Sequence, residues 1–160
     1  MAYTSRIIVV ARQTAASDDL REALVQRAER GPIAVQLLMP AERIGLDGRE
    51  AMQAPLDAAV QSLRAAGLEV DGAVGDCDPV QAVLVAHKPG RFDEVVVCTL
   101  PGASSKWLQM DLPHRIARIC DLPVSHVVAH PPQEHRTGPP PPHEREPLGP
   151  LGVLTWSHPR

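Results

Sequence analysis

The sequence is poor in aromatic residues: only Tyr3, Phe92, Trp107 and Trp156 occur among 160 residues. Proteins that bind single-stranded nucleic acid stack the bases on aromatic side chains, so this scarcity argues against that function. The net charge of −3 also lacks the positive excess with which nucleic-acid binders contact phosphates. We therefore expect an aliphatic core and no nucleic-acid partner.

Long apolar runs and a cysteine framework are missing as well. No run of about 18 apolar residues is present, as a membrane-spanning helix would need, and the N-terminal segment lacks the pattern of a signal peptide. The cysteines Cys77, Cys98 and Cys120 include no CxxC pair and have no histidine at metal-ligand spacing. These absences predict a cytoplasmic protein without disulfides, a metal site or a membrane partner.

The composition changes near His130. Residues 131–160 contain nine of the 17 prolines, including the run 139–142. Such a segment is extended and has too few apolar residues to form a core. We expect one domain over residues 1–130, followed by a flexible Pro-rich tail over 131–160 whose more apolar end either frays or docks. The tail is also a candidate binding segment for a protein partner.

Strand-like and helix-like segments alternate through the first 130 residues. Apolar runs rich in β-branched residues, or alternating with polar ones, predict five strands, at 6–10, 33–38, 68–74, 94–99 and 123–128. The run 68–74 alternates apolar and polar residues, which is typical of an edge strand with one face partly in water.

Helix signals separate these strands. Ser17, followed by two aspartates, predicts the start of the first helix, and Asp78 before Pro79 predicts the start of the third. Apolar residues between Met52 and Leu63 keep helical spacing and predict the second helix, with Pro55 in its first turn. The fourth helix is expected to have Asp111 as its cap and to carry three apolar residues, Leu112, Ile116 and Ile119.

Five strands separated by four helices predict an α/β fold. The expected architecture is a doubly wound, five-stranded parallel sheet in the order 3-2-1-4-5, with right-handed crossovers and helices on both faces. In such sheets ligands bind beyond the carboxyl ends of the strands, where the strand order reverses. That crevice is expected between the loops 11–14 and 99–106. The second loop contains small and hydroxylated residues and ends in Lys106, which suits an anion.

Signatures of common doubly wound enzymes are missing. The sequence has no Walker loop, no GxGxxG after the first strand and no GxSxG elbow. A cysteine phosphatase loop beginning at Cys98 would need an arginine where Ser104 stands. We therefore expect no catalytic activity, and a weak nucleotide hydrolase is the less favoured alternative.

Several single residues are expected to have packing roles. Cys98 lies within an apolar strand and is predicted to be an inert core thiol. His126 and His130 are interpreted as packing or solvated residues, because no acidic partner is near them in the sequence. Trp107 is either a hydrophobic plug under the last helix or a stacking platform.

Three parts of the sequence together resemble the universal stress protein family over about residues 5 to 129. These are the opening strand RIIVV, the segment GDCDPVQAV over 75–83, and the ending, in which strand 94–99 leads through a loop and a helix to the strand start at Pro123. The resemblance implies a stress-response or regulatory domain. It also implies a homodimer, formed through the last strand at Val124–Val128.

This sequence departs from the family at two nucleotide-binding positions. Nucleotide-binding members carry an acidic residue just after the first strand, where Ala11 and Arg12 stand here. They also carry a glycine motif, G-x2-G-x9-G-[ST]. Its positions fall approximately on Leu100, Ala103, Met110 and Asp111, with six residues in place of nine between the second and third positions. The chain is therefore similar to a divergent member without the usual glycine motif. Arg12 and Lys106 are expected to neutralise an anion jointly.

The candidate binding residues follow from the crevice and from the resemblance. They are Ala11, Arg12, Gly75, Thr99, Gly102, Ala103, Ser104, Ser105 and Lys106. The leading hypothesis is a non-catalytic regulatory domain that binds a small anion or nucleotide between strands 1 and 4. The second is binding of ATP or another adenine nucleotide through a remodelled phosphate loop. The third is an adaptor that recruits partners through its Pro-rich tail.

Overall fold

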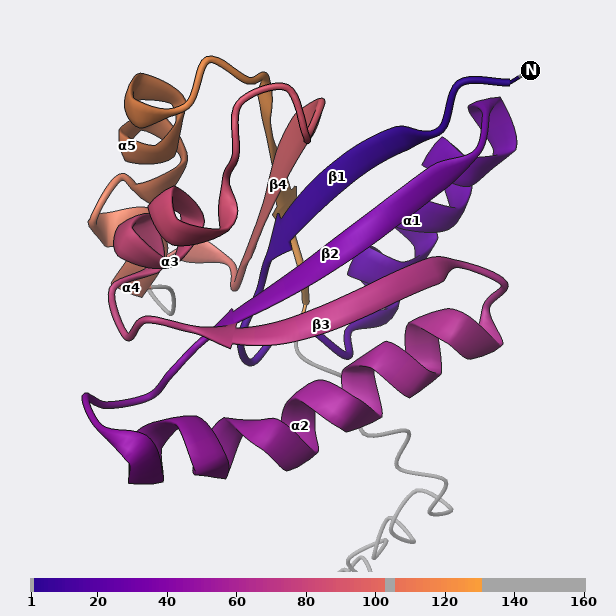
Figure 1. Cartoon of the computed structure of the whole chain (residues 1–160). Helices are drawn as coiled ribbons and strands as arrows, with labels where there is room; N and C mark the ends of the chain where they lie inside the picture. The colour runs from indigo at the N-terminus through magenta and orange to yellow at the C-terminus, as the bar shows by residue number, and fades with distance from the viewer. Residues whose placement is uncertain (1, 103–105, 131–160) are drawn as a thin grey trace, which may run out of the picture.

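The β-branched runs form a five-stranded parallel sheet in the computed structural model, which describes residues 2–102 and 106–130 (Figure 1). The strand order is β3-β2-β1-β4-β5, as predicted. The strands are β1 (Ser5–Val10), β2 (Ile33–Pro40), β3 (Glu69–Gly75), β4 (Glu94–Thr99) and β5 (Val124–Val128). The helices are α1 (Asp18–Arg30), α2 (Leu46–Ala65), α3 (Pro79–Ala86), α4 (Lys106–Gln109) and α5 (Leu112–Ile119).

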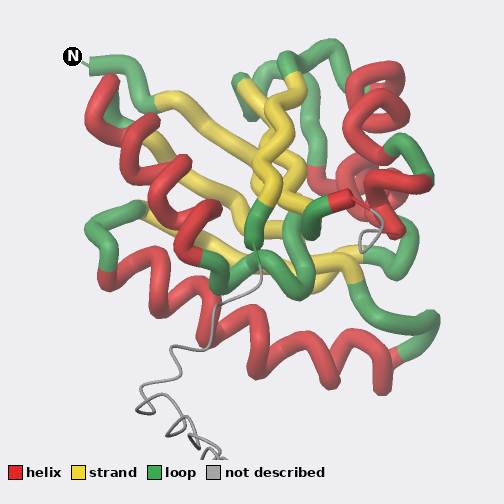
Figure 2. Tube along the Cα trace, turned by 180° about the vertical axis from the view of Figure 1, so that it is seen from behind, coloured by secondary structure: helices red, strands yellow, loops and turns green. Residues whose placement is uncertain are grey.

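The central strand β1 is buried on both faces, because helices cover both sides of the sheet. Ile7 and Val9 point into the core beneath α1 and α2, whereas Ile8 and Val10 point into the core beneath α3 and α5. Figures 1 and 2 show the two helix pairs on opposite sides of the sheet. The run of four apolar residues is therefore explained by burial on both faces.

The capping residues of α1 and α3 behave as predicted. The Ser17 hydroxyl accepts the backbone N–H of Leu20 at 3.3 Å, and the Asp78 carboxylate accepts that of Val80 at 2.9 Å. Each side chain satisfies a helix N–H that has no partner within its own helix.

The prediction for the start of α2 was wrong. The helix begins at Leu46, so Pro55 lies in its interior and not in its first turn. The predicted stripe is buried from Leu56 to Leu63, but between Leu46 and Pro55 only Gly48 is buried. Because the first half of α2 is largely exposed, it lacks the apolar period from which a helix is recognised.

The segment between β4 and β5 also differs from expectation. It contains the four-residue helix α4, where the sequence predicted only a loop. Asp111 precedes α5 as predicted, but its side chain forms no capping bond, and its backbone has a φ of 52°. Its carboxylate instead contacts Nδ1 of His114 at 2.6 Å. Leu112 and Ile116 are buried, whereas Ile119 is 38% exposed.

The described part of the chain ends beside the start of α1. The backbone N–H of His130 donates to the carboxylate of Asp19 at 2.7 Å. The predicted tail, 131–160, lies outside the described residues. Within residues 2–102 and 106–130, no helix has both the length and the apolar character needed to cross a membrane.

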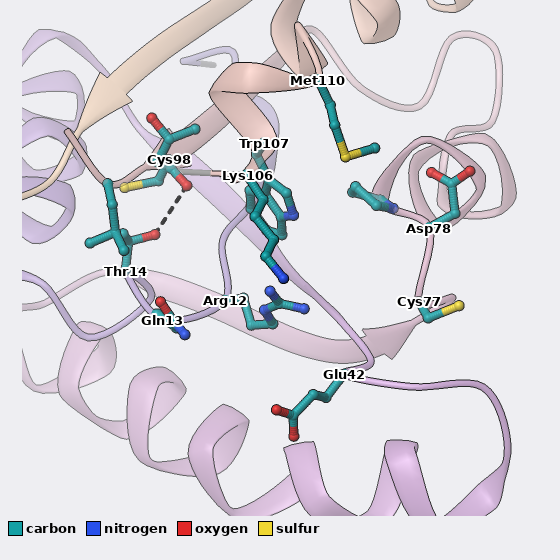
Figure 3. Close-up of a pocket in the computed structure, with 13 residues that line it drawn as sticks. Arg12, Gln13, Thr14, Glu42, Cys77, Asp78, Cys98, Lys106, Trp107 and Met110 are labelled. Carbon is teal, nitrogen blue, oxygen red and sulfur yellow. Dashed lines mark hydrogen bonds between the residues drawn. The ribbon is translucent and has the colours of Figure 1, made fainter. Parts of the chain in front are cut away.

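A hydrogen bond joins the loop after β1 to strand β4 at the strand-order reversal. The Thr14 hydroxyl, which follows β1, donates to the backbone carbonyl of Cys98 in β4 at 3.0 Å (Figure 3). Thr14 is only 4% exposed. The loop after β1 is thus fixed to the neighbouring strand by a buried hydrogen bond. Loss of this bond would destabilise the fold, because the buried carbonyl of Cys98 would be left without a donor.

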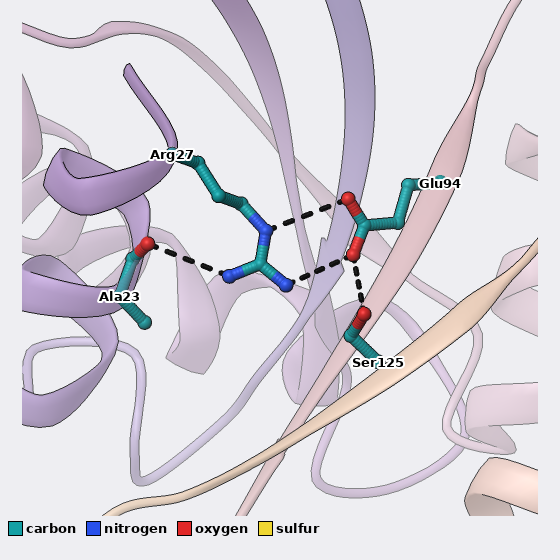
Figure 4. A network of polar contacts seen from close by, with 4 residues as sticks. All are labelled: Ala23, Arg27, Glu94 and Ser125. Atoms are coloured by element: carbon teal, nitrogen blue, oxygen red, sulfur yellow. Dashed lines mark hydrogen bonds and ion pairs between the residues drawn. The ribbon is translucent and has the colours of Figure 1, made fainter. Parts of the chain in front are cut away.

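A polar network at the opposite end of β4 fixes this strand to α1 and β5 (Figure 4). Arg27 of α1 forms an ion pair with Glu94 at 2.9 Å, and Ser125 of β5 donates to the same carboxylate. Burial acts to raise the pKa of Glu94, but the bonds from Arg27 and Ser125 together hold that pKa below its usual value. The carboxylate is therefore charged in the folded protein at neutral pH.

We expect Glu94→Gln to lower the free energy of unfolding by about 1–3 kcal/mol at pH 7, because a charge-assisted contact is lost. Because the pKa of Glu94 is lower in the folded than in the unfolded protein, the Glu94 carboxylate stabilises the fold fully at pH values above its unfolded pKa of about 4.3. This stabilisation is lost as the pH falls through the pKa of Glu94 in the folded protein. Urea unfolding at several pH values should show the difference from wild type shrinking in acid. Glu29→Gln, at an exposed site on α1, is the control. A difference independent of pH would contradict this account.

Candidate functional site

The carboxyl ends of β1 and β4 border a pocket with a volume of about 710 Å³ (Figure 3). It lies where the sheet order reverses, the position at which doubly wound domains bind ligands. Its lining comes from the loops after β1, β2, β3 and β4, the end of β4, the start of α3, and α4 with the residue that follows it. The lining residues are Arg12, Gln13, Thr14, Glu42, Cys77, Asp78, Pro79, Cys98, Thr99, Leu100, Lys106, Trp107 and Met110.

The loop after β1 places Arg12 at this pocket. Ala11, immediately before it, is fully buried, and its backbone N–H donates to the carbonyl of Leu38 in β2 at 3.2 Å. Thr14, two residues after Arg12, is bonded to β4. Because both neighbours of the Arg12–Gln13 segment are fixed, the backbone at Arg12 has little freedom to move away.

The short helix α4 supplies the other cationic side chain. Lys106 begins α4, and Trp107 follows it. The Trp107 ring packs against the core beneath α3 and α5, which agrees with the predicted plug. The guanidinium carbon of Arg12 lies 5.7 Å from the centre of the Trp107 ring, within the range of a cation–π contact.

Two like charges therefore converge in the pocket. In Figure 3 the side chains of Arg12 and Lys106 point toward one another. Within the part of the chain that the structure describes, neither forms an ion pair within 4.0 Å. Two facing cations repel each other, so an anion between them would relieve an unfavourable interaction.

The acidic lining residues are placed elsewhere in the pocket. Asp78 caps α3 through its bond to Val80, and Glu42 extends from the loop after β2. Figure 3 shows both of these carboxylates away from the Arg12–Lys106 pair. The charge of the pocket is thus asymmetric, with the positive charge concentrated at Arg12 and Lys106.

The structure brings together some of the predicted binding residues. Arg12, Thr99 and Lys106 line the pocket. Ala11 does not line it, because its side chain is buried in the core beneath α1 and α2. Gly102 is exposed and lies outside the lining set, and residues 103–105 lie outside the described residues.

Gly75 has a clear packing role, and its predicted role in ligand binding stays a prediction. It ends β3 and faces α3 so closely that an added Cβ would lie 2.6 Å from the Cβ of Ala82. Gly75 is not among the lining residues. The glycine therefore allows β3 and α3 to approach each other, which a side chain would prevent.

The structure adds residues that the candidate set did not include, among them Glu42, Asp78 and Met110. Glu42 follows β2, and Asp78 follows β3. The rule that parallel strands share one carboxyl edge would have found both residues if it had been applied to every strand. Met110 follows α4, and no sequence signal placed it there.

Cys98 has the predicted surroundings and His126 is exposed, but His130 has an acidic partner that the sequence did not indicate, because its Nδ1 lies 3.4 Å from the carboxylate of Asp19. Cys98 is fully buried, and burial raises the pKa of its thiol, so the thiol stays protonated at neutral pH. His126 contacts the hydroxyl of Thr99 through Nε2 at 2.7 Å. That contact fixes the Thr99 side chain at the end of β4.

Comparison with known proteins gives a match in structure only. No protein-family model matches the sequence, and no curated protein matches it. A solved universal stress protein in complex with cAMP is 20% identical, has a TM-score of 0.54, and covers 80% of this chain and 98% of its own.

Two further solved structures come from Archaeoglobus fulgidus. Its universal stress protein in complex with dAMP is 14% identical, has a TM-score of 0.53, and covers 79% of this chain and 99% of its own. Another universal stress protein structure from this organism is 15% identical, has a TM-score of 0.57, and covers 78% and 98%, respectively.

The sheet topology and these structural matches together define the architecture of the domain. The parallel sheet in the order β3-β2-β1-β4-β5, with helices on both faces, makes this a doubly wound α/β domain. Within that class the chain has the fold of the universal stress proteins. The resemblance seen in the sequence is thus confirmed at the level of the fold.

We expect Gly75→Ala to lower the free energy of unfolding by about 1–3 kcal/mol, because the new methyl group overpacks the contact with Ala82. Gly31→Ala is the matched control, since an added Cβ at Gly31 meets no atom within 4 Å. Both values come from urea unfolding. If Gly75→Ala were as stable as Gly31→Ala, the close-approach role of Gly75 would be wrong.

Proposed function

We propose that the protein is a non-catalytic regulatory domain of the universal stress protein type, which binds a small anionic ligand between β1 and β4. The observation that carries this proposal is the convergence of Arg12 and Lys106 in the pocket. A cationic pair at the carboxyl edge of a doubly wound sheet suits a phosphate or a carboxylate.

An adenine nucleotide is the ligand we propose first. Two of the solved structures with this fold are complexes with cAMP and dAMP. The pocket has a volume of about 710 Å³, within the usual range for small-molecule sites. In this proposal the side chains of Arg12 and Lys106 hold the phosphate, in place of the glycine motif that the sequence lacks.

The lining of the pocket supports binding without catalysis. The thiol of Cys98 is buried and protonated, and the hydroxyl of Thr14 donates to a backbone carbonyl. Asp78 is engaged as a helix cap. Among the described lining residues no histidine is present to act as a general base. The absence of enzyme activity stays a prediction.

The dimer implied by the family resemblance is part of this proposal. β5 is an edge strand in the described sheet, and Val128 is 40% exposed. An unpaired edge with an exposed apolar side chain is suited to a second copy of the chain. We propose that Val124–Val128 forms this contact.

We expect the double variant Arg12→Ala with Lys106→Ala to lower the affinity for AMP by at least about 30-fold, because two charge-assisted contacts to the phosphate are lost. Isothermal titration calorimetry measures the affinity. Thermal unfolding with and without AMP provides a second measurement, because a bound ligand stabilises the folded state.

The control for this experiment is the double variant Lys88→Ala with Arg118→Ala. Both residues are exposed and lie outside the pocket lining, so the same two charge types are removed elsewhere. This control should bind AMP like the wild type. If the Arg12 and Lys106 double variant bound AMP equally well, the assignment of the site would be wrong.

A further inference from the structure

The contact between Arg12 and Trp107 carries a more specific inference about the ligand. Trp107 is half-buried and packs against the core beneath α3 and α5, so its ring is held in place from below. The Arg12 guanidinium lies over this ring at 5.7 Å. Trp107 therefore positions the cationic group that enters the pocket, without needing to contact the ligand itself.

A guanidinium held over an aromatic ring keeps its N–H groups available. The N–H groups of arginine lie in the plane of the guanidinium and form a fork that matches two oxygens of one anion. The cation–π contact with the ring favours a guanidinium position at this side of the pocket. Arg12 can there bind an anion through two of its oxygens.

Lys106 adds a second charge beside this fork. It lies next to Trp107 in α4, and its side chain points toward Arg12. A phosphate monoester has three terminal oxygens and a charge near −2 at neutral pH. Two of the oxygens can pair with Arg12 and the third with Lys106. A cyclic phosphodiester has only two such oxygens and one negative charge.

The acidic lining residues disfavour negative charge in the part of the ligand that lies beyond the phosphate. Glu42 and Asp78 lie in the same pocket, away from the cationic pair. A second or third phosphate that extended toward them would meet like charge, which is unfavourable without a metal ion. A single phosphate with an uncharged remainder avoids this repulsion.

We infer that the site selects a small phosphate monoester, such as a nucleoside monophosphate, and that Trp107 is a positioning residue for Arg12. This inference rests on the proposed function, because it specifies the ligand class of the same pocket. The inference predicts that the protein binds phosphate monoesters more tightly than cyclic diesters or triphosphates. The proposal of an adenine-nucleotide site alone does not predict this preference.

The first test compares three probes on the full-length wild-type protein by isothermal titration calorimetry at pH 8 without divalent cations. AMP is a monoester, cAMP is a cyclic diester, and ATP is a triphosphate. We expect AMP to bind at least about tenfold more tightly than either of the others. The phosphate of cAMP lacks the third terminal oxygen and the second charge, and the additional phosphates of ATP extend toward Glu42 and Asp78. Inorganic phosphate should compete with AMP.

The second test removes the ring beneath Arg12. We expect Trp107→Leu to weaken binding of both AMP and inorganic phosphate by about two- to fivefold, the range of a partly exposed cation–π contact. Trp107→Phe keeps an aromatic face and should restore most of the affinity. The loss with inorganic phosphate separates positioning of Arg12 from stacking of a base, since inorganic phosphate has no base.

Phe92→Leu is the matched control for loss of packing. Phe92 is a partly buried aromatic residue that packs against the same core as Trp107 but lies outside the pocket lining. Urea unfolding of both leucine variants reports whether they fold. Phe92→Leu should bind AMP like the wild type.

The outcomes distinguish the two proposals. If no probe bound the wild-type protein, the proposed function would fail, and the inference would fail with it. If cAMP or ATP bound as tightly as AMP, the pocket would still be a nucleotide site, but the selection of monoesters would be wrong. If folded Trp107→Leu bound inorganic phosphate like the wild type, or if Phe92→Leu weakened binding equally, Trp107 would have no positioning role.

Discussion

Strand β1 pairs with both β2 and β4, and this central position determines where the other strands and the crevice lie. Because Ile7 to Val10 are buried on both faces, β1 must lie in the middle of the sheet. The chain then crosses to one side for β2 and returns to the other side for β4. This reversal opens the crevice at their carboxyl ends. The bond from Thr14 to the carbonyl of Cys98 fixes the two sides of the crevice to each other.

The site is built from this scaffold by a few local features. The buried Ala11 and the bonded Thr14 hold the loop that carries Arg12, while the packing of Trp107 holds α4 and therefore Lys106. At the far end of β4, the Arg27–Glu94 pair fixes the same strand against α1. Arg12 is thus held by the fixed loop after β1, and Lys106 is placed by the packing of its neighbour Trp107.

Much of the fold could be predicted from the sequence, because burial leaves a clear pattern. The run Glu94–Thr99 is a strand with the predicted bounds, and the caps at Ser17 and Asp78 are formed. The first half of α2 could not be predicted, because it is largely exposed and has no apolar stripe. The helix α4 was missed because four residues are too few to show a helical period.

The candidate site was predictable in position but not in detail. The strand order placed Arg12, Thr99 and Lys106 at one crevice, and all three line the pocket. The sequence could not place the Arg12 guanidinium over Trp107, because that contact depends on where α4 packs. The sequence also could not show how closely Gly75 packs against Ala82, because that contact depends on where α3 lies against β3.

A crystal structure of the full-length protein grown with AMP would show where the anion binds. We expect electron density for the phosphate between Arg12 and Lys106, with two of its oxygens facing the Arg12 guanidinium. A nucleotide bound with its phosphate away from both residues, or outside the crevice between β1 and β4, would show that the cationic pair is not the anion site.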